Sequence, residues 1–293
     1  MSLQTASVTG GTSSETMLKL KQFMSNRGAV LGLVIVMTLI VVALFAPMIA
    51  PYDPQMMGAG RRLQPPSFAY PFGTDEFGRD LYSRVIYGSR LTLLIAAIAV
   101  GIALAVGLTI GLIGGYAGGW TERVVMRLVD VVFSFTETLI ALAAVAILGP
   151  SLKNAMIAVG IATMPFYARI CYSTVLVEKN KPYFEATVAA GAGHARILFL
   201  HLLPNILPTM VVVATLGVST AILAAAGLSF LGLGAQPPSP EWGWMLSAGR
   251  DYFSRAPWMM IVPGVAIAIT VLGFNLLGDG VREILDPRQT NRR

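Results

Sequence analysis

Six long apolar runs leave few folds open to this chain. They lie at residues 28–50, 91–115, 124–148, 155–177, 206–233 and 259–277. Each run is close to the roughly 20 residues that an α-helix needs to cross the hydrocarbon core of a bilayer. Only 12% of the residues are charged, whereas about a quarter of the residues in a soluble domain are charged. The sequence therefore predicts an all-α polytopic membrane protein with six transmembrane helices.

An even number of spans puts both termini on one side of the membrane. If the N-terminus is cytoplasmic, thirteen of the 21 lysines and arginines lie on the cytoplasmic side and eight on the other. Lysine and arginine favour cytoplasmic loops, so we expect cytoplasmic termini. Pro165 and Arg169 interrupt the fourth run. We still expect this run to span, because neighbouring helices can satisfy the backbone groups that a proline frees.

The runs divide the chain into successive segments. The first residues are rich in Ser, Thr and Gly and are expected to be partly disordered. No A-x-A-like cleavage site accompanies the first run, which we interpret as a retained anchor. The expected segments are a cytoplasmic tail at 1–27, a first transmembrane helix at 28–50, a periplasmic segment at 51–90 with an interfacial helix, a core at 91–279 with five transmembrane helices and a cytoplasmic segment at 178–204, and a cytoplasmic tail at 280–293.

The periplasmic segment has its own helix signals. Residues 73–75 suit a turn and a helix cap, and the acidic residues precede the basic ones, as the helix dipole prefers. We expect an amphipathic helix along the membrane surface before the second span. In this helix Asp75 and Asp80 can pair with Arg79 and Arg84.

The hydrophilic segment at 178–204 predicts a bent helical element. Asn180 can cap a helix and Pro182 fits its first turn, so a helix is expected from about Lys181. Gly191 and Gly193 then interrupt it, because glycine in a helix interior costs about 1 kcal/mol relative to alanine. The bulky residues expected to pack on the membrane domain after the bend are Ile197, Leu198, Phe199, Leu202 and Leu203.

This segment carries a recognisable spacing. Glu185, Ala186 and Gly191 are followed, after eleven residues, by the pair Leu203 and Pro204. The pattern resembles the cytoplasmic coupling segment of bacterial ABC-importer permeases. Four further stretches, at 26–54, 72–90, 228–242 and 274–287, resemble the peptide, nickel and opine group of these permeases, and within it the C-type subunit of dipeptide permeases.

The resemblance implies a type I ABC-importer permease in the bacterial inner membrane that passes dipeptides, oligopeptides, opines, nickel chelates or related small solutes. It implies a second permease subunit, two cytoplasmic ATP-binding subunits and a periplasmic substrate-binding protein as partners. No Walker A sequence occurs in this chain. ATP and Mg are therefore expected on the partner subunits, and the chain itself is not expected to be an enzyme. The residues that the resemblance assigns to ATPase coupling are Glu185, Ala186, Ala190, Gly191, Gly193 and Pro204.

Two acids lie in the third run. Asp130 and Glu137 are seven residues apart, which predicts one helical face. Asp130 is expected near the inner surface, paired with Arg127 or another arginine. Glu137 lies deeper, and two interpretations are open: it lines the substrate path and attracts a cation such as a peptide amino terminus, or it hydrogen-bonds to a neighbouring helix. A proton-coupled secondary carrier that uses both acids is the alternative function.

Other site chemistry has little support in the sequence. Cys171 is the only cysteine, and the two histidines, His194 and His201, have no other ligand type at metal-binding spacing. We expect no catalytic residue, metal or cofactor in this chain. Its net charge of +6 is explained by basic residues that set topology and meet anionic lipid. No nucleic-acid partner is expected.

Overall fold

The computed structural model describes residue 21 and residues 23–285. Within these residues all regular structure is helical, apart from one isolated bridge between Thr74 and Asp80. The elements are α2 (Arg27–Leu44), α3 (Ala46–Ile49), α4 (Leu81–Ala117), α5 (Gly119–Phe133), α6 (Glu137–Leu148), α7 (Leu152–Lys179), α8 (Pro182–Ala189), α9 (His194–Arg196), the π-helical turn η1 (Ile197–Leu202), α10 (Leu203–Phe230), α11 (Trp242–Arg250) and α12 (Trp258–Leu285).

Five of the helices are long and apolar enough to cross a membrane. They are α2, α4, α7, α12 and the continuous helix formed by α9, η1 and α10, and the bent pair α5 and α6 can form a sixth span. The prediction of an all-α polytopic membrane protein is therefore confirmed. The fourth run forms α7 without a break through Pro165, as expected.

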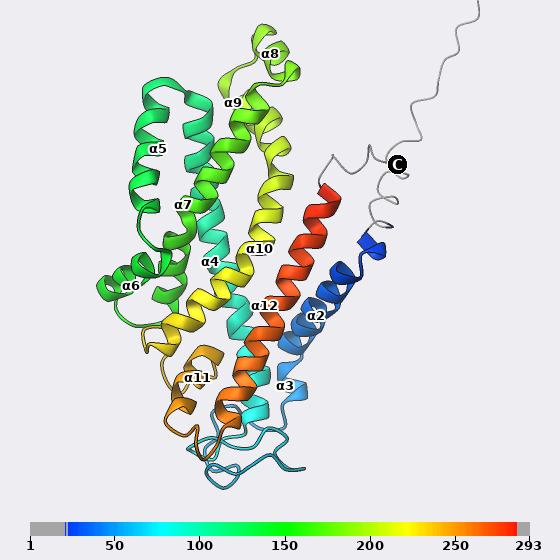
Figure 1. Ribbon diagram of the computed structural model, residues 1–293, viewed down its shortest axis with the longest axis vertical. Helices are drawn as coiled ribbons and strands as arrows, with labels where there is room; N and C mark the ends of the chain where they lie inside the picture. The colour runs from blue at the N-terminus through cyan, green and yellow to red at the C-terminus, as the bar shows by residue number, and fades with distance from the viewer. Residues whose placement is uncertain (1–20, 22, 286–293) are drawn as a thin grey trace, which may run out of the picture.

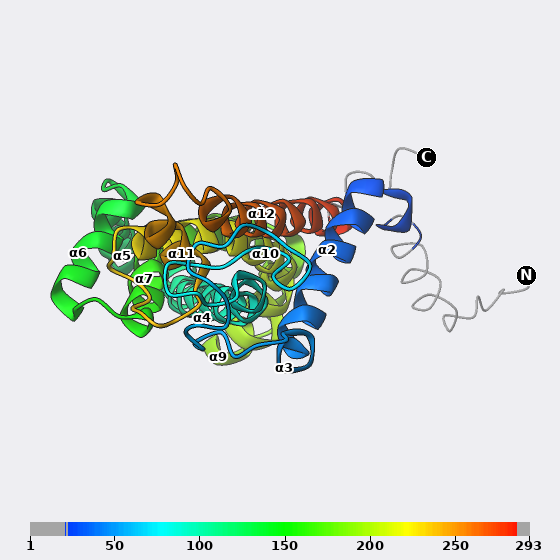
Figure 2. The same ribbon diagram turned by 90° about the horizontal axis from the view of Figure 1, so that it is seen from below.

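The helices run between two ends of an elongated molecule (Figure 1). At the coupling end, α8 projects beyond the long helices, and at the loop end lie residues 50–80 and α11 with its flanking loops. Seen from below, the 50–80 segment lies over the ends of the helices (Figure 2). The side-chain amide of Asn26 donates to Glu283 at 2.5 Å, which ties the start of α2 to the end of α12.

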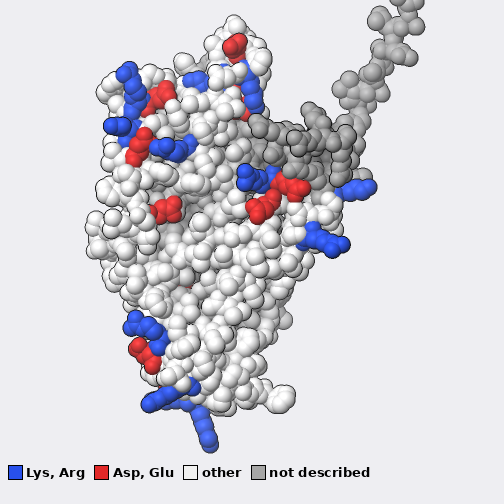
Figure 3. Space-filling view, in the orientation of Figure 1, with Lys and Arg blue, Asp and Glu red and all other residues white. Residues whose placement is uncertain are grey.

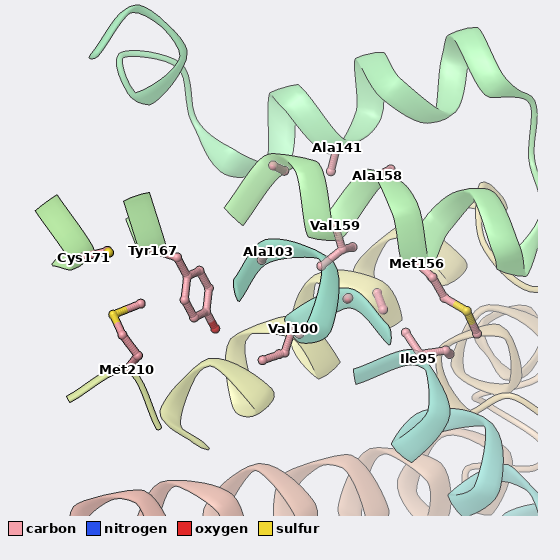
Figure 4. Packing of buried hydrophobic residues seen from close by; sticks show 14 of the residues in the cluster. Ile95, Val100, Ala103, Ala141, Met156, Ala158, Val159, Tyr167, Cys171 and Met210 are labelled. Carbon is pink, nitrogen blue, oxygen red and sulfur yellow. The ribbon is translucent and has the colours of Figure 1, made fainter. Parts of the chain in front are cut away.

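The core centres on the contact between α4 and α7, which is the most extensive between any two helices. Gly107, Gly111 and Gly115 lie on one face of α4 and let the backbone of α7 approach closely. Figure 4 shows the Tyr167 ring projecting from α7 into the buried cluster, with Cys171 and Met210 close by. Cys171 is fully buried.

The third apolar run is not one straight helix. It divides into α5 and α6, whose axes differ by 89°. Between them the Ser134 hydroxyl donates to the carbonyl of Val131, and Thr136 adopts an extended conformation. Serine and threonine compete for backbone hydrogen bonds in this way and weaken a helix. Asp130 and Glu137 therefore lie on different helices, and the prediction of one shared face is wrong.

The predicted surface helix between residues 75 and 90 is also wrong. Residues 81–90 are the first turns of α4, and Asp80 caps that helix by accepting from the backbone N–H and hydroxyl of Ser83 at 2.9 and 2.6 Å. The helix begins no earlier, because Gly78 has φ +72°. Asp75 does pair with Arg79 at 2.5 Å and with Arg84 at 3.7 Å.

Candidate coupling segment and substrate path

The segment between α7 and α10 is bent at the predicted place. Helix α8 begins at Pro182, but its N-cap is Lys181, and Asn180 instead ends α7. Gly191 has φ +74°, in the left-handed region that favours glycine. Since helical structure resumes only at His194, the chain turns over residues 190–193.

The bend forms an open depression of about 450 Å³. Its lining residues are Ala186, Thr187, Ala190, Gly191, Ala192, Gly193, Arg196 and His201. Four of the six residues that the resemblance assigns to ATPase coupling are thus together on one surface. Glu185 is exposed on the first turn of α8 beside the depression, while Pro204 lies outside it, at the start of α10.

A buried carboxylate anchors α8 to the end of α7. Glu178 accepts from the Lys181 ammonium at 2.5 Å and from the Tyr183 hydroxyl at 2.8 Å, and the Asn205 amide donates to that hydroxyl at 3.2 Å. Burial, followed by the hydrogen bond to Glu178, raises the pKa of Tyr183 to about 12. The Phe184 ring is buried in the main core. Helix α8 is therefore held in place by packing and by polar contacts.

A second polar cluster connects the bend to α4. The Tyr116 hydroxyl lies 2.5 Å from Nδ1 of His194, and the two rings are edge to face. The Lys179 ammonium donates to the carbonyls of Gly115 and Tyr116 at 3.0 and 3.2 Å. A cation at the C-terminus of a helix donates hydrogen bonds to the last carbonyls, and it is attracted to the negative end of the helix dipole. Sequence reasoning missed this cluster, because Tyr116 and His194 are 78 residues apart and no spacing rule relates them.

The second half of the segment mostly packs as predicted. Ile197 and Leu202 are buried, and Leu198 and Leu203 pack against the core, but Phe199 is 66% exposed, so its predicted packing is wrong. Residues Ile197–Leu202 form the π-helical turn η1 just before Leu203 and Pro204, the first residues of α10. A proline ring clashes with the carbonyl four residues earlier in an α-helix, and the wider turn relieves this clash.

The two acids of the third run have different surroundings. Asp130 on α5 forms an ion pair with Arg169 on α7, which agrees with the expectation of an arginine partner. The Arg169 guanidinium also lies 5.1 Å from the centre of the Phe133 ring. Glu137 is exposed on the first turn of α6. Helix α6 packs along α7, so both acids lie beside that helix.

Among the residues that the structure describes, no three or more His, Cys, Asp or Glu side chains are arranged so that they could hold a metal ion. His194 and His201 both belong to the coupling segment.

Two family profiles match the sequence. Residues 107–291 match the family described as "Binding-protein-dependent transport system inner membrane component", and residues 17–66 match "N-terminal TM domain of oligopeptide transport permease C". The first match covers more than half of the chain and includes the whole coupling segment.

Curated relatives agree with the profiles. The dipeptide transport system permease protein DppC of Alkalihalophilus pseudofirmus is 46% identical over 92% of this chain and 88% of the relative. The protein of the same name from Escherichia coli strain K12 is 49% identical over 91% of each chain.

A solved structure shares the fold. The match is a chain in a structure titled "Inward facing conformations of the MetNI methionine ABC transporter", with a TM-score of 0.57, 23% identity, and coverage of 69% of this chain and 96% of the other. Together with the profiles and the curated relatives, this places the chain in the family of inner membrane components of binding-protein-dependent transport systems, as a C-type permease.

Proposed function

We propose that this chain forms half of the translocation path of an ABC importer for dipeptides, oligopeptides or related small solutes. The names of the relatives support the cargo class. In this proposal the chain works beside a second permease subunit in a bacterial inner membrane. Two cytoplasmic subunits bind and hydrolyse ATP with Mg, and a periplasmic binding protein delivers the solute.

The observation that carries the coupling role is the exposed depression at the bend. Its alanines and glycines present backbone with little side-chain cover, so a partner surface can approach closely. The contacts of Glu178 and Phe184 fix α8 to the membrane helices, so a push on α8 moves the end of α7 with it. Closure of the partner ATPases would thus reach the path as a rigid-body movement.

The proton-coupled carrier has no support among the described residues or the comparisons. It would use both Asp130 and Glu137, which lie on two helices at 89° rather than on the one face that their spacing predicted. Asp130 is also occupied by Arg169.

The coupling role is tested by Gly191→Val in the transporter reconstituted with its ATPases and binding protein. Valine is strongly disfavoured at positive φ, so the bend must change. We expect a drop of about tenfold or more in uptake and in ATP hydrolysis stimulated by loaded binding protein.

Gly149→Val is the matched control. Gly149 also has positive φ, and an added Cβ there would meet nothing within 4 Å, but it lies outside the coupling segment. We expect this variant to stay within about twofold of the parent. Equal activity of the two variants would contradict the coupling role. Uptake that persists without ATP and stops with a protonophore would overturn the importer proposal itself.

A further inference from the structure

A groove of about 280 Å³ opens between three of the membrane-spanning helices, close to the loop end. It is lined by residues of α2 between 34 and 42, by residues of α12 between 266 and 270, by Val85, Ile86 and Ser89 in the first turns of α4, and by Trp242 of α11. Along α2 the lining covers about 12 Å of helix. An elongated space of this kind suits a linear chain better than a compact solute.

The lining of the groove is mostly hydrocarbon. The hydroxyls of Ser89 and Thr270 donate to carbonyls of their own helices at 2.6 and 2.8 Å, and the indole N–H of Trp242 donates to a carbonyl of α4 at 3.0 Å. Apart from Thr38, the remaining lining side chains are aliphatic. An acyl chain can therefore fill the groove without leaving these polar groups unpaired.

The surface beside the groove has the character of a lipid-facing surface. The large apolar side chains that α2 exposes, each by 45–64%, are Leu31, Val34, Met37, Val41 and Leu44, and Val34 also lines the groove. Contacts between helices in membranes favour small residues, which let backbones approach closely. Helix α2 lies at the edge of the bundle, away from α5 and α6 (Figure 2), and on the face drawn in Figure 3 the surface over α2 and α12 is uncharged along most of its length. Lipid therefore suits this side of the molecule better than the helix of another subunit.

An unpaired positive charge lies at the edge of the groove. Arg90 is one helical turn after Ile86 on α4, so the two residues lie on one side of that helix. Arg90 is exposed and makes no hydrogen bond or ion pair with the residues that the structure describes. Residues 91–117 of α4 carry no charge and are about 40 Å long. A hydrocarbon core of roughly 30 Å therefore fits beside them with Arg90 at its loop-end edge, where lipid phosphates lie.

We propose that the groove and Arg90 bind one phospholipid, with an acyl chain between α2, α4 and α12 and the phosphate on the guanidinium. A guanidinium can bind a phosphate through two parallel N–H groups. Because Arg90 has no acidic partner among the described residues, the site favours a lipid with a net negative charge, such as phosphatidylglycerol, over a zwitterionic one. The bound lipid fills the space between α2 and α4 and so adds to the contacts that hold α2 on the core. The site is independent of the cargo and of the coupling to ATPases.

The test counts the lipids that the assembled transporter retains. The transporter is reconstituted in vesicles of equal parts phosphatidylglycerol and phosphatidylcholine and extracted in mild detergent, and bound lipids are counted by native mass spectrometry. Val34→Trp and Ala266→Phe each fill the groove, from α2 and from α12. Val34 is 55% exposed, so the larger side chain needs no repacking of the core. Met37→Trp and Val265→Phe are the matched controls, because both residues are exposed on the same two helices and lie outside the groove.

We expect the parent to retain one more phosphatidylglycerol per copy of this chain than either filling variant, and the two control variants to match the parent. In Arg90→Gln the ratio of retained phosphatidylglycerol to phosphatidylcholine should fall at least threefold, and Arg90→Lys should restore part of it. The lysine variant keeps the charge but not the two parallel N–H groups.

Equal retention by the parent and both filling variants would overturn the site. It would mean that the retained molecules are general boundary lipid, or that another subunit covers the groove. Loss of lipid in the filling variants with an unchanged ratio in Arg90→Gln would overturn the assignment of the phosphate to Arg90.

Discussion

At the scale of single residues, the contact between Tyr116 and His194 stands out. His194 begins α9 within the coupling segment, while Tyr116 lies in the last turn of α4. Their 2.5 Å contact is a direct polar link from the bend to a core helix. Lys179 holds the same end of α4 from α7. A movement of α9 is therefore passed to α4 and α7 together.

Tyr116→Phe keeps the aromatic ring but removes the hydroxyl, so it should weaken the coupling between a movement of α9 and a movement of α4. The lost hydrogen bond is worth about 0.5–1.5 kcal/mol, or roughly two- to tenfold in an equilibrium. We expect solute taken up per ATP hydrolysed to fall by that factor while ATP hydrolysis persists. Solute uptake and phosphate release are measured in parallel in proteoliposomes. Tyr87→Phe at the loop end of α4 is the control, and an unchanged ratio in Tyr116→Phe would show that the contact transmits nothing.

At the scale of elements, α4 and α7 depend on a stripe of small residues. A Cβ added at Gly111 would lie 2.5 Å from the carbonyl oxygen of Ala168 and 2.5 Å from Cβ of Cys171. At Gly115 it would meet Val175 at 2.7 Å. Neither neighbour can move aside easily, because backbone and buried atoms surround both positions. The stripe therefore sets the distance between the two helices.

Gly111→Ala should destabilise the protein by about 1–3 kcal/mol through overpacking. For a chain of this size that lowers the melting temperature by several degrees, at roughly 2–4 °C per kcal/mol. The measurement is thermal unfolding of the purified chain in detergent. Gly101→Ala on the same helix is the control, since a Cβ there meets nothing within 4 Å. Similar melting temperatures for the two variants would show that α7 adjusts without cost.

The elements also show how far the sequence can predict this fold. The long apolar runs and the bend at Gly191 were predictable, because both depend on local composition and backbone preference. The break between α5 and α6 was not, since Ser134 and Thr136 are too few to make the run polar on average. The pairs Tyr116–His194 and Asp130–Arg169 join distant segments, and only the packing of α5 and α7 brings the second pair together.

At the scale of the whole molecule, each end is held by its own polar cluster. At the loop end, Arg84 donates to the carbonyls of Pro54, Pro238 and Ser239 at 2.8, 3.3 and 3.3 Å, which joins two loops far apart in sequence. Trp258 donates to the carbonyl of Thr74 at 3.2 Å. The buried pair Asp75 and Arg79 lies within this arrangement. The loop end is therefore one packed unit rather than a set of free loops.

Glu76 makes this unit sensitive to pH. Burial, together with the nearby Asp75 carboxylate, raises the pKa of Glu76 above its ordinary value of 4.5. A carboxyl with a raised pKa in the folded state favours folding in its protonated form, and this contribution is lost as pH rises through the folded-state pKa. Acidification from neutral pH towards pH 4.5 should therefore stabilise the parent relative to Glu76→Gln, which cannot titrate.

The measurement is the difference in apparent melting temperature, parent minus Glu76→Gln, at pH 7.5 and at pH 4.5. We expect a larger difference at the lower pH. Asp53→Asn, which removes an exposed carboxylate from the same segment, is the control. If the melting-temperature difference between the parent and Glu76→Gln is the same at both pH values, or is smaller at pH 4.5, then Glu76 is ionised without cost in the folded protein. In that case the arginines of the loop end, rather than burial, set its charge.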